Sequence, residues 1–367
     1  MKNISVIGVG KLGLCFSLTL EKSGYNVVGV DVSEDYVCKL NDKKIETSEP
    51  GVKTMLSTCS NFVATTNLED AVNHSDILFV VVATPSYDSG RYDHRQVDVL
   101  CDKLSELGRQ ETQKHLIVCC TTMPGYCDQV AERMRDFNYT VSYNPEFIAQ
   151  GTILRDQSKP DMVLIGEDNT EVGDIIEKIY HTHTDNEPTI CRMTRTEAEI
   201  TKISLNCFCT TKISFANMIG DIVKKSGGRP EVVLNAIGSD SRVNHKYLKY
   251  GFGYGGPCFP RDNRALSIYA GDIDCPAKIS VATDETNQLH LEEQIKQIQE
   301  TKSDGSEILV DGVAYKKGTT ILEESQQLKY AIKLSDLGYI VTIQDIEDVL
   351  LILKEQYGSK FKYEVIK

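Results

Sequence analysis

Residues 1–30 alternate between apolar runs and a helical pattern, and this order leaves few folds open. Ile4–Ile7 is typical of a buried strand, Leu12–Lys22 of a helix and Tyr25–Val30 of a second strand. A strand, a helix and a strand in that order open a parallel, doubly wound sheet. Further strands are expected at Ile77–Ala83, Leu116–Cys120, Thr140–Ser142 and Met162–Ile165. The sequence therefore predicts an α/β fold.

The segment GVGKLG lies between the first strand and the first helix and contains Gly8, Gly10 and Gly13. The first glycine allows a tight turn, the second lets a pyrophosphate approach the backbone, and the third lets the helix pack on the strand. Asp31 ends the second strand, about 20 residues after the glycines, where an acidic side chain binds the ribose hydroxyls and repels a 2′-phosphate. The pattern predicts a Rossmann-like domain that favours NAD over NADP.

The length of 367 residues allows two or three domains of about 150 residues each. We expect a dinucleotide-binding domain over residues 1–194 and a central helical domain over 195–300. An apolar pattern of helical period without proline predicts one long helix at Glu197–Lys225, a length typical of helices that join domains or form dimer faces. A polar turn then leads into a short α/β domain over 301–367. Further elements are expected at Arg264–Ala270, Ala277–Glu300, Glu307–Val313, Gln326–Leu337 and Tyr339–Gln344.

The composition excludes several classes of function. Lys and Arg number 40 against 53 Asp and Glu, a net charge of −13 that repels polyanions, so no nucleic-acid partner is expected. The sequence shows neither a signal peptide nor a membrane span, and we expect a cytoplasmic protein without a membrane partner. No metal site is expected, because there is no Cys-x-x-Cys pair. Thiols stay reduced in the cytoplasm, so core positions are expected for Cys119, Cys120, Cys207 and Cys209.

A second glycine-rich segment, GFGYGGPCFPRD, spans residues 251–262. Its glycines leave room for a ligand to lie against the backbone. Cys258 follows them beside Arg261, whose cation favours a thiolate, the nucleophilic form of cysteine. A cysteine in such a loop can equally be a buried structural residue. Spacing alone leaves both interpretations of Cys258 open.

Several other motifs carry a resemblance to a known family. They are Thr84 and Pro85 at a strand end, TTMPG at 121–125, NPEF at 144–147, Lys202 and Asn206 in the long helix, and SDSR ending at Arg242. Together with the cysteine segment, their order and spacing resemble those of UDP-glucose 6-dehydrogenases and their nucleotide-sugar relatives over essentially the whole chain. The resemblance implies a four-electron oxidation of UDP-glucose to UDP-glucuronate with two NAD in succession. It also implies a homodimer joined through the long helix.

The resemblance further implies how individual residues act. Cys258 captures an aldehyde as a thiohemiacetal and later carries a thioester that water hydrolyses. Lys202 and Asn206, one turn apart on the helix, face the developing oxyanion. The other implied catalytic residues are Asp262 and Thr121, which hold and polarise water, and Glu146, which relays protons.

The same resemblance assigns binding residues. Those expected to contact NAD are Gly8, Gly10, Leu12, Gly13, Asp31, Thr84, Thr121, Glu146 and Arg261. Those expected to contact the nucleotide sugar are Ser142, Tyr143, Asn144, Pro145, Glu146, Lys202, Asn206, Arg242, Tyr247, Leu248, Lys249, Tyr250, Gly251, Gly255 and Lys316. Of these, Arg242 is expected to reach the substrate of a partner subunit.

Departures from the family pattern bear on the substrate. Arg261 stands where the family usually has Lys, and Ile321 and Glu323 stand where Asp and Arg are common. An anion at 323 weakens binding of a diphosphate, and the third domain is expected to be shortened. The alternatives are a dehydrogenase of a UDP-N-acetyl-hexosamine or of GDP-mannose, and a non-catalytic nucleotide-sugar-binding homologue. A 2-hydroxy acid or 6-phosphogluconate-type dehydrogenase shares the first domain and the long helix but has no use for a nucleophilic cysteine.

Overall fold

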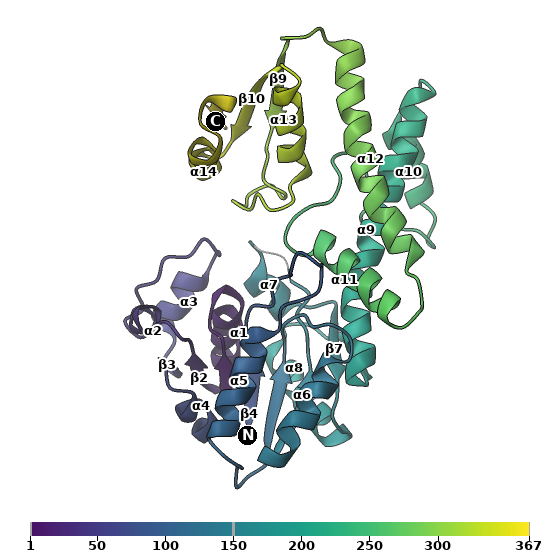
Figure 1. The fold of residues 1–367 in the computed structure, drawn as a ribbon. Coiled ribbons are helices and arrows are strands. Elements are labelled where there is room, and N and C mark those ends of the chain that lie inside the picture. The colour runs from purple at the N-terminus through teal and green to yellow at the C-terminus, as the bar shows by residue number, and fades with distance from the viewer. Residues whose placement is uncertain (1, 149–150, 367) are drawn as a thin grey trace. The chain divides into compact units, whose positions relative to one another are not determined.

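The structure is a computed structural model that describes residues 2–148 and 151–366. It divides into two compact units, Met1–Lys202 and Ile203–Lys367 (Figure 1). The division falls within a helix, a few residues beyond the boundary at 194 that the sequence predicts. That domain boundary remains a prediction.

Within the described residues, the first unit is built on an eight-stranded sheet with the strand order β3-β2-β1-β4-β5-β6-β7-β8. Neighbouring strands are parallel except β6 and β7. The bounds are β1 Asn3–Ile7, β2 Asn26–Val30, β3 Phe62–Thr65, β4 Ile77–Val80, β5 Lys114–Val118, β6 Tyr139–Tyr143, β7 Met162–Gly166 and β8 Thr189–Met193. The 3-2-1-4-5-6 order is that of dinucleotide-binding sheets. The predicted doubly wound sheet is confirmed, and β3 and β8 are strands that the sequence analysis did not predict.

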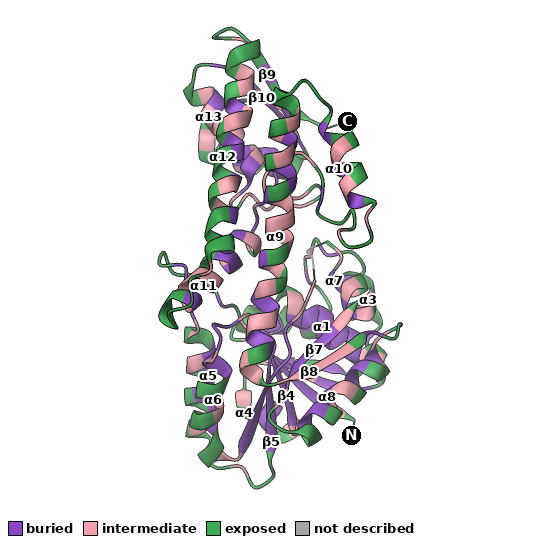
Figure 2. Ribbon diagram, turned by 90° about the vertical axis from the view of Figure 1, so that its right-hand side faces the viewer, coloured by how far each residue is buried: buried purple, intermediate pink, exposed green. Residues whose placement is uncertain are grey.

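Helices cover both faces of this sheet, because alternate strand residues point to opposite faces. Phe79 belongs to the apolar cluster that includes α1 and α8, whereas Leu78 and Val80 belong to the cluster that includes α4, α5 and α6. Figure 2 shows these strands buried and the outer helix faces exposed. The helices are α1 Lys11–Lys22, α2 Glu34–Asn41, α3 Val52–Thr58, α4 Leu68–His74, α5 Arg95–Glu106, α6 Tyr126–Met134, α7 Ile153–Ser158 and α8 Thr170–His183, with a short 3-10 turn at Arg135–Phe137.

The packing of α1 on the sheet fixes where the glycine turn lies. Phe16 of α1 is 1% exposed and meets the ring of Phe79 edge to face, with ring centroids 4.9 Å apart. Burying a phenylalanine side chain contributes roughly 1.5–3 kcal/mol. The predicted helix at Leu12–Lys22 is confirmed as α1, whose first turn begins directly after Gly10 and contains Gly13.

The long helix α9, Arg195–Lys225, confirms the prediction from the apolar pattern. A capping box starts it, because the Glu197 carboxylate accepts hydrogen bonds from the backbone amide (2.9 Å) and the hydroxyl (2.7 Å) of Thr194. The helix ends at Lys225, and Gly227 follows with a φ of +75°, the left-handed conformation common after helix C-termini. It begins in the first unit and continues into the second.

The second unit holds helices and a small parallel sheet of strand order β11-β10-β9, as far as the described residues extend. The helix α11 begins directly after Cys258, earlier than the predicted start at Arg264. Neither α10, α14 nor β11 was predicted. The bounds are α10 Pro230–Gly238, α11 Phe259–Asp272, α12 Lys278–Thr301, β9 Glu307–Asp311, α13 Gln326–Asp336, β10 Ile340–Asp345, α14 Glu347–Tyr357 and β11 Lys362–Val365, with a 3-10 turn at Gly358–Lys360.

Burial agrees with the expected core role of three cysteines, because Cys119, Cys120 and Cys207 are buried. Cys209 is only half-buried. Among the helices of the described chain, none combines the length and apolarity that are needed to cross a bilayer.

Candidate functional site

The glycine turn after β1 has the shape that the sequence predicts. Gly8 has a φ of +92°, and a Cβ there would lie 2.5 Å from the carbonyl oxygen of Val81. A Cβ on Gly13 would lie 1.9 Å from the carbonyl oxygen of Gly8, so helix and turn can pack only through glycine. A Cβ on Gly10 would meet no atom within 4 Å. Open space therefore lies at the N-terminus of α1, where backbone amides attract an anion, and this cradle fits the pyrophosphate of NAD.

The end of β2 provides the next part of a dinucleotide site. A carboxylate oxygen of Asp31 accepts a hydrogen bond from the amide of Ser33 at 3.0 Å, and no Lys or Arg follows in the sequence before Lys39. An acidic side chain without a nearby cation suits ribose hydroxyls and disfavours a 2′-phosphate. The hydroxyl of Tyr36 donates to the carbonyl of Val9 at 3.1 Å and ties this segment to the glycine turn.

Thr84 and Thr121 meet beyond the carboxyl ends of β4 and β5. The hydroxyl of Thr84 donates to the carbonyl oxygen of Thr121 at 2.8 Å. These two strands are neighbours in the sheet, and ligands of such sheets bind at the carboxyl ends of the strands. The structure thus brings together two residues that the sequence places far apart.

Glu199 of α9 holds the segment that contains Thr121, although no motif identified it. Its buried carboxylate accepts hydrogen bonds from the hydroxyl of Thr122 (2.8 Å) and from the amides of Gly125 (2.6 Å) and Cys127 (2.9 Å). Two of these donors are at the start of α6, so the carboxylate caps that helix. Burial raises the pKa of Glu199. An acid in a helical pattern gives no signal of a contact more than 70 residues away, which is why the sequence analysis missed it.

Lys202 and Glu146 lie together in the first unit. The Lys202 ammonium donates to the carbonyl oxygen of Glu146 at 2.6 Å and lies 4.4 Å from the centroid of the Phe147 ring. Burial raises the pKa of the Glu146 carboxyl to about 7, against the opposing effect of the Lys202 charge. A carboxyl that titrates near neutral pH beside a buried ammonium is suited to proton transfer.

The side chains at the end of β6 are buried, and that of the following Asn144 is hydrogen-bonded within the protein. Ser142, Tyr143 and Asn144 are buried. The Asn144 side chain donates to the carbonyl of Leu164 at 2.9 Å and accepts from the hydroxyl of Tyr180 at 2.8 Å. These side chains therefore hold the strand in place, and a contact of this segment with a substrate falls to its backbone atoms. The predicted substrate role of residues 142–145 stays a prediction.

In the second unit, Asn206 of α9 donates to a carboxylate oxygen of Asp262 at 2.6 Å. Asp262 is 1% exposed and lies in the first turn of α11. The exposed Cys258 occupies the N-cap position of the same helix, where the positive end of the helix dipole favours a thiolate. The Nε atom of Arg261 lies 3.7 Å from the other Asp262 oxygen. Three predicted residues, Asn206, Arg261 and Asp262, thus lie at the first turn of α11, which presents the Cys258 thiol.

The glycines before Cys258 have a packing role that the sequence did not reveal. A Cβ on Gly255 would lie 2.4 Å from the carbonyl oxygen of Glu324, and one on Gly256 2.4 Å from the ring of Tyr315. The Gly256 amide donates to the carbonyl of Glu323 at 3.0 Å. Burial and the charge of Cys258 raise the pKa of Tyr315, which no motif had identified. Glycine is therefore required at positions 255 and 256 by close contact with the Glu324 backbone and the Tyr315 ring, besides any space that a ligand needs.

The remaining predicted substrate residues lie on the surface of the second unit or in its turns. Arg242 forms a two-point ion pair with Asp240 at 2.9 and 2.7 Å. Tyr247 and Lys249 are exposed, whereas Leu248 packs into an apolar cluster. Lys316 lies in a turn closed by the hydroxyl of Thr319, which donates to its carbonyl at 2.8 Å.

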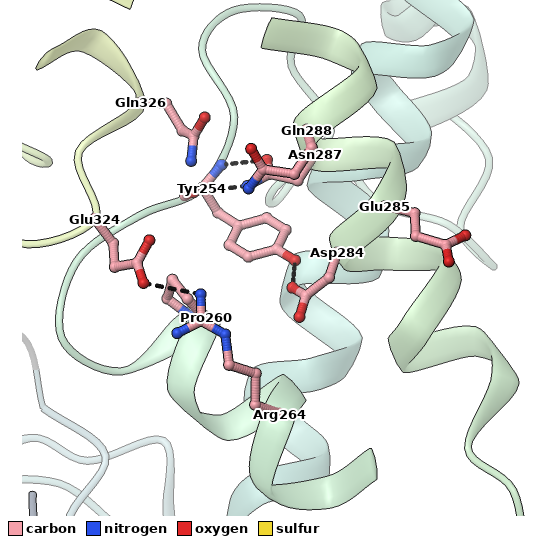
Figure 3. Close-up of a pocket in the computed structure, with 9 residues that line it drawn as sticks. All are labelled: Tyr254, Pro260, Arg264, Asp284, Glu285, Asn287, Gln288, Glu324 and Gln326. Atoms are coloured by element: carbon pink, nitrogen blue, oxygen red, sulfur yellow. Dashed lines mark hydrogen bonds and ion pairs between the residues drawn. The ribbon is translucent and has the colours of Figure 1, made fainter. Parts of the chain in front are cut away.

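Tyr254 and Pro260 of the cysteine segment take part in lining a cavity of about 270 Å³ (Figure 3). Tyr254 is fixed at its wall, because its amide donates to the Asn287 side chain and its carbonyl accepts from it, both at 3.0 Å. Arg264 pairs with Glu324 at 2.8 Å on the opposite side. None of the predicted site residues lines the cavity, whose walls are Tyr254, Pro260, Arg264, Asp284, Glu285, Asn287, Gln288, Glu324 and Gln326.

The structure therefore gathers predicted residues into two groups, one in each unit. The first unit joins Thr84 with Thr121, and Lys202 with Glu146. The second joins Asn206 with Asp262 beside the thiol. In the described part of the chain, no cluster of three or more His, Cys, Asp or Glu side chains could hold a metal ion.

Comparison with known proteins covers most of the chain. The model described as the UDP-glucose/GDP-mannose dehydrogenase family, NAD binding domain, matches residues 2–184. The model for the central domain of the same family matches residues 196–289.

Individual relatives carry more than one substrate name. The GDP-mannose 6-dehydrogenase of Pseudomonas aeruginosa is 30% identical over 356 residues, which are 93% of this chain and 80% of that protein. The UDP-glucose 6-dehydrogenase of Rhizobium meliloti is 30% identical over 359 residues, 94% of this chain and 81% of that protein. The solved UDP-glucose dehydrogenase of Pyrobaculum islandicum superposes with a TM-score of 0.88 at 27% identity, over 99% of this chain and 86% of that one.

Proposed function

Because the chain belongs to the UDP-glucose/GDP-mannose dehydrogenase family, we propose that this NAD-dependent nucleotide-sugar dehydrogenase oxidises UDP-glucose to UDP-glucuronate. The observation that carries the chemistry is an exposed thiol, Cys258, at the N-terminus of α11 beside the Asn206–Asp262 pair. The likeness to the Pyrobaculum islandicum UDP-glucose dehydrogenase supports the choice of sugar.

The proposed reaction has two oxidations and one hydrolysis. The turn of Gly8, Gly10 and Gly13 would hold NAD, which when bound would supply the hydride acceptor for both oxidations. The first oxidation turns the primary alcohol into an aldehyde, and the Cys258 thiolate adds to its carbonyl carbon to form a thiohemiacetal. The second oxidation leaves a thioester. Water then adds to the thioester carbonyl and the thiolate departs, so that each sugar yields a carboxylate, two NADH and three protons.

The first unit supplies a cation and a proton acceptor to this scheme. Lys202 is buried, so its ammonium interacts strongly with the oxyanion of each tetrahedral species. Glu146, whose pKa is about 7, accepts a proton from the attacking water and returns it to solvent.

The second unit supplies the nucleophile and its support. Asp262 is buried and hydrogen-bonded to Asn206, an arrangement that holds the amide of Asn206 in one orientation. We assign Asn206 to the oxyanion and Asp262 to the proton exchanges of the thiol and of water.

We also propose that the enzyme is a homodimer formed through α9. Apolar side chains recur on this helix at a spacing of seven residues, with Phe208 64%, Phe215 42% and Ile222 54% exposed. Leu205 and Met218 extend the same exposed stripe, at 40% each. Contiguous exposed apolar surface of this kind is typical of an interface, and Arg242 is then the residue that reaches the partner's substrate.

GDP-mannose is the second candidate substrate, because the Pseudomonas aeruginosa GDP-mannose 6-dehydrogenase is 30% identical to this chain. Initial rates of NADH formation with UDP-glucose, GDP-mannose, UDP-N-acetylglucosamine and UDP-N-acetylgalactosamine separate the candidates. We expect the largest kcat/KM with UDP-glucose. A larger value with another nucleotide sugar reassigns the substrate, and no NADH with any of the four, despite binding, identifies a non-catalytic homologue.

A further inference from the structure

The backbone that precedes the cysteine segment is held by side chains of α9 and α12. The Gly251 amide donates to the Asn217 side-chain oxygen at 3.0 Å. The Gly251 carbonyl oxygen lies 2.6 Å from Nε2 of His290 and accepts from the Gln294 side chain at 3.2 Å. Both polar groups of this glycine are therefore bound by side chains from two helices, in a segment where regular structure supplies no partners.

His290 has acceptors on both sides of its ring. Nδ1 lies 2.6 Å from a carboxylate oxygen of Asp221, and Nε2 faces the Gly251 carbonyl. A backbone carbonyl can only accept hydrogen bonds, so Nε2 donates to Gly251, while Nδ1 pairs with the Asp221 side chain. The His290 side chain is 1% exposed, so the ring is enclosed between Asp221 and the Gly251 carbonyl.

Asp221 connects this ring to the next residue of the segment. Its second oxygen accepts a hydrogen bond from the hydroxyl of Tyr250 at 2.8 Å. The Tyr250 ring lies edge to face with the His290 ring, with centroids 5.4 Å apart. It also packs against Gly220, where a Cβ would lie only 1.9 Å from the ring. The two oxygens of one carboxylate thus bind Tyr250 directly and Gly251 through His290.

We propose that Asp221 and His290 are positioning residues that fix the backbone of residues 250–252 for binding of the nucleotide sugar. The inference rests on the proposed function and on the contact of residues 247–251 with the nucleotide sugar that the family resemblance predicts. If a glycine-containing segment becomes ordered only when the ligand binds, the lost backbone entropy weakens the binding free energy. A segment that is already held in its bound conformation avoids this loss, so the ligand binds more tightly. The two residues act through Gly251 and Tyr250, not through the reacting atoms.

Substitutions at His290 and Asp221 separate positioning from general stability. His290→Phe keeps a ring but removes both ring nitrogens, whereas His290→Gln keeps one amide donor for the Gly251 carbonyl. Asp221→Asn gives a second test that does not depend on the ring. Leu289→Ala is the control, because Leu289 is the adjacent residue of α12 and is 68% exposed.

We expect His290→Phe and Asp221→Asn to raise the KM for the nucleotide sugar by about tenfold, the scale of one or two lost hydrogen bonds. The KM for NAD and kcat should change by less than about twofold, His290→Gln should recover most of the loss, and Leu289→Ala should match the wild type. Hydrogen exchange at residues 250–256 should be faster in His290→Phe and normal in His290→Gln.

Unchanged exchange at residues 250–256 in both His290→Phe and Asp221→Asn would overturn the proposal whether or not the enzyme is active. Equal loss of affinity for NAD and for the sugar, together with a lowered Tm, would instead assign the pair a structural role and also overturn it. Failure of the wild type to oxidise any nucleotide sugar would refute the proposed function, while the exchange result would still decide the positioning.

Discussion

At the residue scale, the chemistry depends on one thiol whose environment is set by the start of a helix. Cys258 is exposed at the N-cap of α11, and Pro260 lies in the first turn of that helix. Proline is favoured there because its missing amide has no partner in a first turn and its fixed φ suits the helix. Pro260 of the glycine-rich segment therefore favours the start of the helix that presents the thiol.

Replacing Cys258 by serine should abolish the second oxidation while leaving ligand binding intact. A serine hydroxyl is far less ionised than a thiol near neutral pH, so no covalent adduct forms and production of the carboxylate should fall by about 10³-fold or more. Carboxylate formation and equilibrium binding of NAD and UDP-glucose are the measurements. Cys275→Ser, at another exposed cysteine, is the matched control and should keep wild-type rates. Unchanged turnover of Cys258→Ser would remove this residue from the mechanism.

Glu146 should give the hydrolysis step a pH dependence with a midpoint near 7. Burial favours the neutral acid and raises its pKa to about 7, so the carboxylate that accepts a proton from water forms only as the pH rises through that value. The rate of thioester hydrolysis should therefore rise between pH 6 and 8 (about one unit on each side of the pKa) and level off above. Glu146→Gln should be slower and lose this transition in single-turnover measurements. A variant with the wild-type profile would assign the transition to another group.

At the scale of elements, α9 connects the functions of the chain. Its capping box at Thr194, its buried acid Glu199 and its charged residue Lys202 occupy the first turns, and Asn206 follows one turn later. Farther along, Asp221 belongs to the proposed positioning pair. One helix thus caps α6, places the ammonium and supports the substrate segment.

Charge placed on the exposed apolar stripe of α9 should dissociate the proposed dimer. The double substitution Phe208→Glu and Phe215→Glu introduces repulsion and removes apolar contact area at positions 64% and 42% exposed in the chain. We expect light scattering to give twice the chain mass of 40.9 kDa for the wild type and the single-chain mass for the variant. Because Arg242 is assigned to the partner's site, the variant should also lose kcat/KM.

The control for this experiment is Leu351→Glu on α14, an apolar residue 58% exposed in the same unit but outside α9. It should keep the mass and activity of the wild type. A wild-type mass of 40.9 kDa would contradict the dimer, and an unchanged mass of the double variant would place the interface elsewhere.

Periodicity predicted the longer elements well and the short ones poorly. The helices α1, α9 and α12 carry apolar residues over several turns, and each was predicted within a few residues of its bounds. The strand β3 has only four residues, and β8 is mostly half-exposed, so neither gives a clear apolar run. The predicted start of α11 at Arg264 is late because proline and glycine before it are typical of a loop, although Pro260 also suits a first helical turn.

At the scale of the whole molecule, the sequence was informative where a motif repeats a local geometry. The spacing of Gly8, Gly10 and Gly13 predicted a cradle that the structure contains, because Gly8 and Gly13 pack against atoms near them in sequence or beside the adjacent strand, and Gly10 borders open space. Glu199 and His290 were missed because their partners lie about 70 residues away, a separation that no local pattern encodes. The roles of the site residues in the reaction remain predictions that await experiment.

The number of NADH molecules formed per sugar tests the central claim, a double oxidation through a covalent adduct of Cys258. The endpoint is measured with limiting nucleotide sugar, using the one with the largest kcat/KM, and excess NAD. We expect two NADH per sugar for the wild type and a carboxylate product. One NADH per sugar, with an aldehyde or ketone as product, would contradict the account.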